Sequence, residues 1–246
     1  MSLGNGEYLI ISSCLKCPYE FKSISLLMQE ISSCYNIKIN EATFLEIKPQ
    51  EATYDTIWNG EIKECNSKEF SIDKLEKYFL SSLDIEFDES TVARLQVNFV
   101  DYICYEVSMI FNYTQLIEEE NKIENKVKNA IFVEGIGLHI FKRLAPILGK
   151  ICIESSMSSI SSIIDREESL PIDRAFYSKY FFDKQPELFN ILVNSDCFIK
   201  EIEDIGIYFR KGKEEDFIIK KMDSIMYEEI FSRVVVVLKE LFEDVF

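Results

Sequence analysis

Glycine and proline are scarce in this chain, with 8 glycines and 5 prolines among 246 residues. These two residue types supply the tight turns of sandwiches and barrels, so their scarcity disfavours all-β folds with many hairpins. Hydrophobic residues make up 47% of the chain and aromatic residues 13%, which suffices for a packed core. Together these features predict a globular protein dominated by long helices.

The first 83 residues carry a mixture of strand and helix patterns. Short apolar runs bounded by turn residues predict strands, and apolar side chains at spacings of three and four predict helices. The predicted elements are strands over residues 7–13 and 40–48, helices over 18–31 and 71–81, and a hairpin around Asn59-Gly60. We therefore expect an α/β domain over residues 1–83.

The rest of the chain, residues 84–246, is predicted to be all-helical. A stripe that includes Leu95, Phe99 and Tyr102 predicts a long amphipathic helix over 95–111. Further helices are expected over residues 127–153, 174–182, 188–193, 198–209 and 223–246. The last of these is amphipathic, and its apolar stripe needs either a partner surface or a core of its own. The boundary between the two domains falls at residues 83–90.

The charge narrows the possible partners. The chain has 43 acidic against 27 basic residues and a net charge of −16. This acidic charge balance argues against nucleic-acid binding through phosphates. Binding to a basic protein partner and mimicry of DNA remain possible functions. The longest uncharged apolar run near the C-terminus, Val234 to Leu238, is too short to span a bilayer, so no transmembrane segment is expected.

Cys14-Leu-Lys-Cys17 is the sharpest local motif. It follows a predicted strand and opens a predicted helix, where the helix N-terminus and Lys16 would lower the pKa of Cys17. Cys17 is the candidate nucleophile and Cys14 the candidate resolving thiol, although two of seven cysteines can also fall this close through packing alone. The odd cysteine count and the lack of a signal peptide predict reduced thiols and an intracellular location.

Other motifs point to no cofactor and no metal. His139 is the single histidine, which removes multi-histidine zinc sites, and it is expected to be a core or boundary residue. Gly135-Ile-Gly137 lacks the third glycine of a nucleotide-binding loop and fits close helix packing. The acidic runs at residues 118–120 and 214–216 are expected to be solvated helix ends.

The predicted order of elements resembles the glutathione transferase fold. Cys17-Pro18-Tyr19 at the start of the first helix is similar to the omega-class and chloride-channel-like members. Residues 169–177, in which Asp173 would cap a helix, are similar to the motif before the family's sixth helix. The resemblance implies a mostly helical α+β fold, with a thioredoxin-like N-terminal half followed by an all-α C-terminal half.

Within that superfamily the metaxins look closest. The similar stretches are Gly60-Glu-Ile-Lys-Glu, the predicted helix over residues 97–113, and residues 188–209. This resemblance implies a non-enzymatic protein-interaction subunit in outer-membrane protein sorting and assembly. Its partners would be proteins of a membrane-associated complex, and its location the cytosol or the cytosolic face of the mitochondrial outer membrane.

Two alternative functions stay open. Glutathione transferases place a cis proline before the third strand, whereas residues 50–57 of this chain contain no proline. The lack of this proline weakens the case for glutathione binding, and it favours the hypothesis of a non-enzymatic protein. The first alternative is a glutathione-dependent thiol transferase that uses Cys17, with glutathione as its only cofactor. The second is an acidic immunity protein or DNA mimic, which the net charge of −16 suggests.

Overall fold

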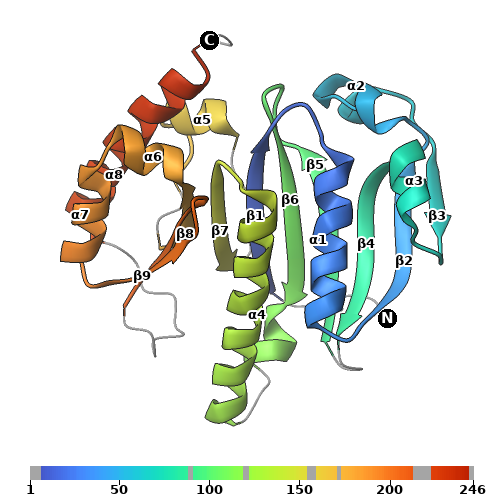
Figure 1. Ribbon diagram of the computed structural model, residues 1–246, viewed down its shortest axis with the longest axis horizontal. Coiled ribbons are helices and arrows are strands. Elements are labelled where there is room, and N and C mark those ends of the chain that lie inside the picture. Colours follow the sequence, from blue (N-terminus) through green and yellow to red (C-terminus); the bar gives the residue numbers. More distant parts are fainter. Residues whose placement is uncertain are drawn as a thin grey trace.

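A computed structural model describes residues 7–87, 91–118, 122–153, 159–170, 173–212 and 223–243. They form a ten-stranded antiparallel sheet with helices packed on it (Figure 1). The strands are β1 (Tyr8–Lys16), β2 (Ile37–Leu45), β3 (Glu64–Ser67), β4 (Phe79–Phe87), β5 (Thr91–Phe99), β6 (Cys104–Asn112), β7 (Leu148–Ile153), β8 (Arg174–Ser178), β9 (Cys197–Ile202) and β10 (Gly206–Lys211). The helices are α1 (Phe21–Cys34), α2 (Tyr54–Trp58), α3 (Ile72–Lys77), α4 (Ile123–Leu144), α5 (Ile160–Ile164), α6 (Lys179–Lys184), α7 (Glu187–Asn194) and α8 (Ser224–Leu241), with short turns η1 (Pro49–Glu51) and η2 (Thr114–Glu118).

The strand order is β3-β2-β4-β5-β6-β1-β7-β8-β10-β9. A thioredoxin-like half contains a strand–helix–strand unit whose two strands are parallel and lie in one small sheet. Here the strands that flank α1 are separated by β4, β5 and β6, and β1 pairs antiparallel with β6 and β7 instead. The predicted fold class, a thioredoxin-like half followed by an all-α half, is therefore wrong.

The region predicted to be all-helical contributes most of the sheet. The predicted helix over residues 95–111 is the hairpin of β5 and β6, which pair from Ala93–Phe111 to Phe99–Tyr105. In β5, buried residues alternate with partly exposed ones, so the true period is two. The predicted boundary at residues 83–90 overlaps the second half of β4 and ends just before β5, and these two strands pair with each other.

Positive φ values in the described part of the chain are not confined to glycine. Four other residues there have one: Ala145, Arg166, Asp196 and Asp204. Asp204 lies in the turn between β9 and β10, so the predicted helix over residues 198–209 is a hairpin. Aspartate tolerates the left-handed conformation better than most residues do, which is why few glycines did not prevent an extensive sheet.

Several other predicted elements need correction. Asn59-Gly60 does not form a hairpin, because Asn59 ends α2, and Thr53 caps the start of that helix. The predicted helices over 71–81, 127–153 and 174–182 each combine a helix with a strand: α3 with β4, α4 with β7, and β8 with α6. The predictions of a first strand, a first helix, a second strand and a C-terminal amphipathic helix are confirmed as β1, α1, β2 and α8.

Helices α1 and α4 lie side by side across one face of the sheet (Figure 1). They bury residues such as Ile31 and Phe141 against the apolar side of β1, β4, β5 and β6. Phe141 of α4 stacks on Phe176 of β8 with ring centroids 5.2 Å apart, so α4 also reaches the C-terminal strands. This layer forms the larger core of the protein.

Helices α5 to α8 form a second core with the other side of the C-terminal strands. The apolar side of α8, including Ile230, Val234 and Leu238, is fully buried against residues such as Tyr177 and Phe209. The stripe on the C-terminal helix is therefore satisfied by the protein's own core. Cys14 and Cys104 lie at the edge of this second core, where β1 and β6 approach it.

Candidate functional site

The structure places Cys17 in the loop between β1 and α1, and it places Cys14 within β1. The helix begins at Phe21, so Cys17 is not at the helix N-terminus, contrary to the expectation from sequence. The Cys17 N–H donates to the carbonyl oxygen of Ile103 at 2.8 Å, which ties this loop to the connection between β5 and β6. Cys14 is fully buried and Cys17 is half-buried.

The surroundings of these thiols oppose the thiolate form. The pKa of Cys17 is raised to about 12, first by burial and then by the Asp101 carboxylate and the Cys14 thiol. A hydrogen bond with Cys14 and burial likewise raise the pKa of Cys104. A thiol of this kind stays protonated at neutral pH, whereas nucleophilic cysteines have lowered pKa values. The roles of Cys17 as nucleophile and Cys14 as resolving thiol stay predictions.

Asp101 has a structural role beside the thiols. Its Oδ1 accepts hydrogen bonds from the N–H groups of Ile103 at 3.0 Å and Cys104 at 2.8 Å. Its Oδ2 accepts from the N–H of Ile160, the first residue of α5, at 3.1 Å. The buried carboxylate therefore joins the β5–β6 connection to α5 and satisfies three backbone donors.

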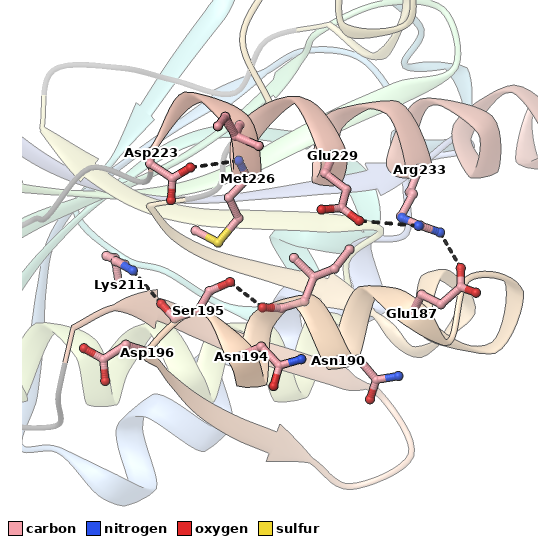
Figure 2. Close-up of a pocket in the computed structure, with 12 residues that line it drawn as sticks. Glu187, Asn190, Asn194, Ser195, Asp196, Lys211, Asp223, Met226, Glu229 and Arg233 are labelled. Atoms are coloured by element: carbon pink, nitrogen blue, oxygen red, sulfur yellow. Dashed lines mark hydrogen bonds and ion pairs between the residues drawn. The ribbon is translucent and has the colours of Figure 1, made fainter.

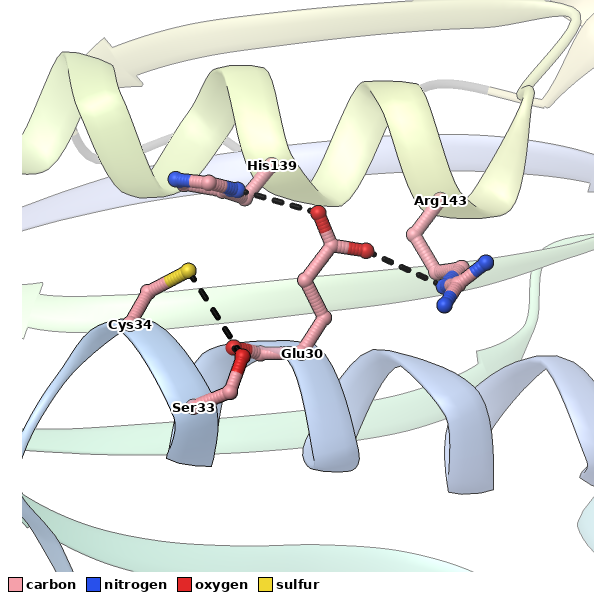
Figure 3. A network of polar contacts seen from close by, with 5 residues as sticks. All are labelled: Glu30, Ser33, Cys34, His139 and Arg143. Atoms are coloured by element: carbon pink, nitrogen blue, oxygen red, sulfur yellow. Dashed lines mark hydrogen bonds and ion pairs between the residues drawn. The ribbon is translucent and has the colours of Figure 1, made fainter.

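His139 lies on α4 and contacts α1, as Figure 3 shows. Its Nδ1 is 3.1 Å from Glu30 Oε1, and Arg143 Nε is 3.0 Å from Glu30 Oε2. One carboxylate of α1 thus contacts the side chains of both His139 and Arg143 on α4. The prediction of a satisfied boundary histidine is confirmed, and within the described ranges no cluster of His, Cys, Asp and Glu side chains has the arrangement of a metal site.

A groove of about 850 Å³ lies between α7 and α8, and sequence reasoning did not predict it. Figure 2 shows its walls: α7 supplies Glu187 and Asn190, while α8 supplies Glu229 and Arg233. Its apolar part is formed by Ile191, Ile225 and Met226. Ile225 is 81% exposed, which is unusual for an isoleucine in a folded protein.

Acidic groups outnumber basic groups along this groove. Its carboxylates are Glu187, Asp196, Asp223 and Glu229, and its basic residues are Lys211 and Arg233. Both basic side chains already have partners within the groove. Arg233 pairs with Glu187 and with Glu229, and Lys211 donates to the carbonyl oxygen of Ser195.

Local structure fixes the carboxylate of Asp223 and the backbone of Asp196. Asp223 caps α8 by accepting a hydrogen bond from the N–H of Met226 at 3.0 Å. Asp196 has a φ of 54°, and its carbonyl oxygen accepts a hydrogen bond from Gly212 at 3.2 Å. An acidic rim beside exposed apolar surface is suited to a ligand that carries both positive charge and apolar groups.

Comparisons with known proteins identify no family. No family model and no curated protein matches this chain. Among solved structures, the chain is similar to Pseudomonas aeruginosa T6SS protein PA0821, with 8% sequence identity and a TM-score of 0.43 over 96% of this chain and 72% of that chain. This likeness is too distant to bear on function.

The resemblance to glutathione transferases and metaxins is wrong. One antiparallel sheet of ten strands takes the place of the thioredoxin-like and all-helical halves on which that resemblance depended. The mitochondrial sorting role and location that it implied lose their basis with it. No helix in the described part of the chain is both long enough and apolar enough to cross a membrane.

Proposed function

We propose that this protein is an acidic, non-enzymatic binding protein whose partner is a basic protein, as in the immunity and DNA-mimic class. The observation that carries the proposal is the acidic rim of the α7–α8 groove, beside the exposed side chain of Ile225. Four carboxylates face two basic residues in the groove, so its acidic groups exceed what Arg233 and Lys211 can neutralise.

The charge of the whole chain supports the same proposal. A net charge of −16 attracts basic partners over distances of about 10 Å and raises their association rates at low salt. The apolar residues of the groove would contribute affinity that does not depend on salt. Binding should therefore weaken as salt rises without disappearing altogether.

The thiol transferase alternative receives less support. Its nucleophile, Cys17, has a pKa raised to about 12, so only a trace of thiolate exists at neutral pH. Glutathione chemistry would also need a binding site, and the resemblance that suggested one no longer applies.

The proposal is tested by calorimetric titration with an eight-residue peptide of alternating lysine and leucine. We expect saturable binding that the double variant Asp196→Asn, Glu229→Gln weakens roughly 3- to 10-fold, since exposed charge pairs contribute about 0.2–1 kcal/mol each. The matched control, Glu76→Gln with Glu203→Gln, removes the same charge at exposed sites outside the groove. Equal affinities of the two double variants, or binding insensitive to salt, would refute the groove as the binding site.

A further inference from the structure

We infer that Tyr54, Trp58 and Tyr102, together with Asp55, form a second docking site that takes arginine or lysine side chains of a basic protein segment. The inference rests on the proposed function in one respect only, the basic character of the partner. It assigns a separate surface, formed by α2 and the connection between β5 and β6.

The three aromatic rings gather at the surface. Trp58, the only tryptophan in the chain, is 58% exposed, and Tyr102 is 68% exposed. The ring of Tyr54 contacts both, with centroids 4.8 Å from Tyr102 and 6.5 Å from Trp58. Large exposed aromatic side chains in one cluster are typical of binding hot spots, in which Trp and Tyr are enriched.

The cluster is held in place before any partner arrives. Trp58 Nε1 donates to the carbonyl oxygen of Phe99 at 3.0 Å, which fixes the indole against the end of β5. Helix α2 begins with a reciprocal cap, in which Thr53 and Thr56 each accept the other's backbone N–H. A side chain that is already ordered loses little conformational entropy on binding.

The charge of the cluster selects cations. Asp55 Oδ1 accepts hydrogen bonds from Tyr102 Oη at 3.2 Å and from Asn59 Nδ2 at 3.3 Å, so the carboxylate lies beside the exposed ring of Tyr102. A carboxylate next to aromatic faces favours guanidinium and ammonium groups through Coulomb and cation–π attraction. An anion or a phosphate would meet repulsion instead.

The protein's own cations leave these rings free. In the described parts of the chain, the cation–ring contacts involve the rings of Phe242, Phe231, Tyr180 and Phe198. Among the described basic side chains, none is placed over Tyr54, Trp58 or Tyr102. The site is therefore open to a cation from another molecule.

Trp58 fluorescence provides a direct measurement, because this residue is the only tryptophan. The probe is a hexa-arginine peptide, with a hexa-glutamate peptide as the charge control. We expect a saturable change in Trp58 emission with hexa-arginine alone, and an affinity that falls when NaCl rises from 0.05 to 0.5 M. A linear change equal to that of free N-acetyl-tryptophanamide would mean collisional quenching and would overturn the inference.

Variants separate this site from the groove. Asp55→Asn removes the charge and Tyr102→Phe removes the hydroxyl, and both conserve size. Tyr102→Ala removes the whole ring. We expect Asp55→Asn and Tyr102→Ala to weaken hexa-arginine binding at least roughly threefold. Tyr78→Ala, at a partly exposed tyrosine on another segment, should leave the Trp58 response unchanged. Equal melting temperatures establish that each variant is folded.

The outcomes distinguish the two proposals. Loss of the Trp58 response in Asp55→Asn, with no loss in the groove variant Asp196→Asn, Glu229→Gln, supports the aromatic site whatever happens at the groove. An unchanged response in both Asp55→Asn and Tyr102→Ala overturns the aromatic site and leaves the groove proposal standing. Saturable binding of oligo-thymidylate in place of hexa-arginine, or emission changes that follow protein concentration through self-association, would also overturn it.

Discussion

The behaviour of each cysteine in this protein depends on its immediate neighbours. Cys17 has the raised pKa because it is half-buried, next to the Asp101 carboxylate and the Cys14 thiol. Cys34 and Cys65, in contrast, lie exposed on α1 and β3. A motif that resembles a redox pair in sequence therefore lies in a setting that protects the protonated thiol.

Alkylation by iodoacetamide, followed residue by residue with mass spectrometry, checks this difference. At pH 7.5 we expect Cys17 to react at least about a hundredfold more slowly than Cys65, since a thiol with a pKa of about 12 holds very little thiolate. Its rate should rise about tenfold per pH unit between pH 7 and 10, because the whole range lies below the pKa. If Cys17 were labelled as fast as Cys65, the raised pKa of Cys17 would be contradicted, and the thiol transferase hypothesis would regain support.

Two glycines in α4 offer a matched pair of substitutions. A Cβ at Gly137 would lie 2.8 Å from Ile151 Cδ1, whereas a Cβ at Gly135 would have its nearest neighbour, Tyr35 Oη, at 3.4 Å. We expect Gly135→Ala to raise the free energy of unfolding by about 0.5–1 kcal/mol, the usual gain of alanine over glycine in a helix. Gly137→Ala should lose that gain through crowding against β7. Urea unfolding of both variants measures the difference, and equal stabilities would contradict the close packing of α4 on β7.

At the scale of elements, α4 contacts both the central strands β1 and β7 and the C-terminal strand β10. Its residues pack on β1 and β7, and its Glu134 carboxylate pairs with the guanidinium of Arg210 on β10 at 3.2 Å. The side chain of Arg210 is 2% exposed, and that of Glu134 is 12% exposed. A buried pair of this kind is costly to break from one side, because the remaining charge loses an ionic contact without regaining water.

We expect Glu134→Gln to lower the free energy of unfolding by about 1.5–3 kcal/mol, since the buried guanidinium of Arg210 loses its charged contact with Glu134 while it keeps its other contacts. The double variant Glu134→Gln, Arg210→Met should be less destabilised than the sum of the two single variants, because each single variant already removes the Glu134–Arg210 contact. Urea unfolding of the two single variants and the double variant gives the coupling free energy between residues 134 and 210. Additive effects of the two substitutions would show that the ion pair contributes no coupling free energy to stability.

Elements whose apolar pattern had one clear period could be predicted from the sequence. The stripe from Phe21 to Ile31 became α1, and the stripe that includes Ile230 and Val234 became α8. Prediction failed where a strand is buried on both faces, as in β6, since such a strand has no alternation to distinguish it from a buried helix. It failed also at the β9–β10 hairpin, where Asp204, a residue other than glycine, has the positive φ of the turn.

At the scale of the whole molecule, the candidate sites are products of the tertiary fold. The groove brings together Glu187, Asp196 and Glu229 from separate elements, and the aromatic cluster brings Tyr102 from a turn to Trp58 on α2. The excess of acid follows directly from composition, and a basic partner is the proposal that this excess suggests. The sequence could not predict where the acids gather, because that requires the strand order.

The central position of β1 has a consequence for how the protein is made. Its partner strands lie far along the chain, since Ile10 pairs with Ile110 of β6 and with Cys152 of β7. During synthesis β1 therefore cannot pair along both edges until β7 has emerged from the ribosome. A nascent chain halted before residue 148 would present one open edge of an apolar strand to chaperones.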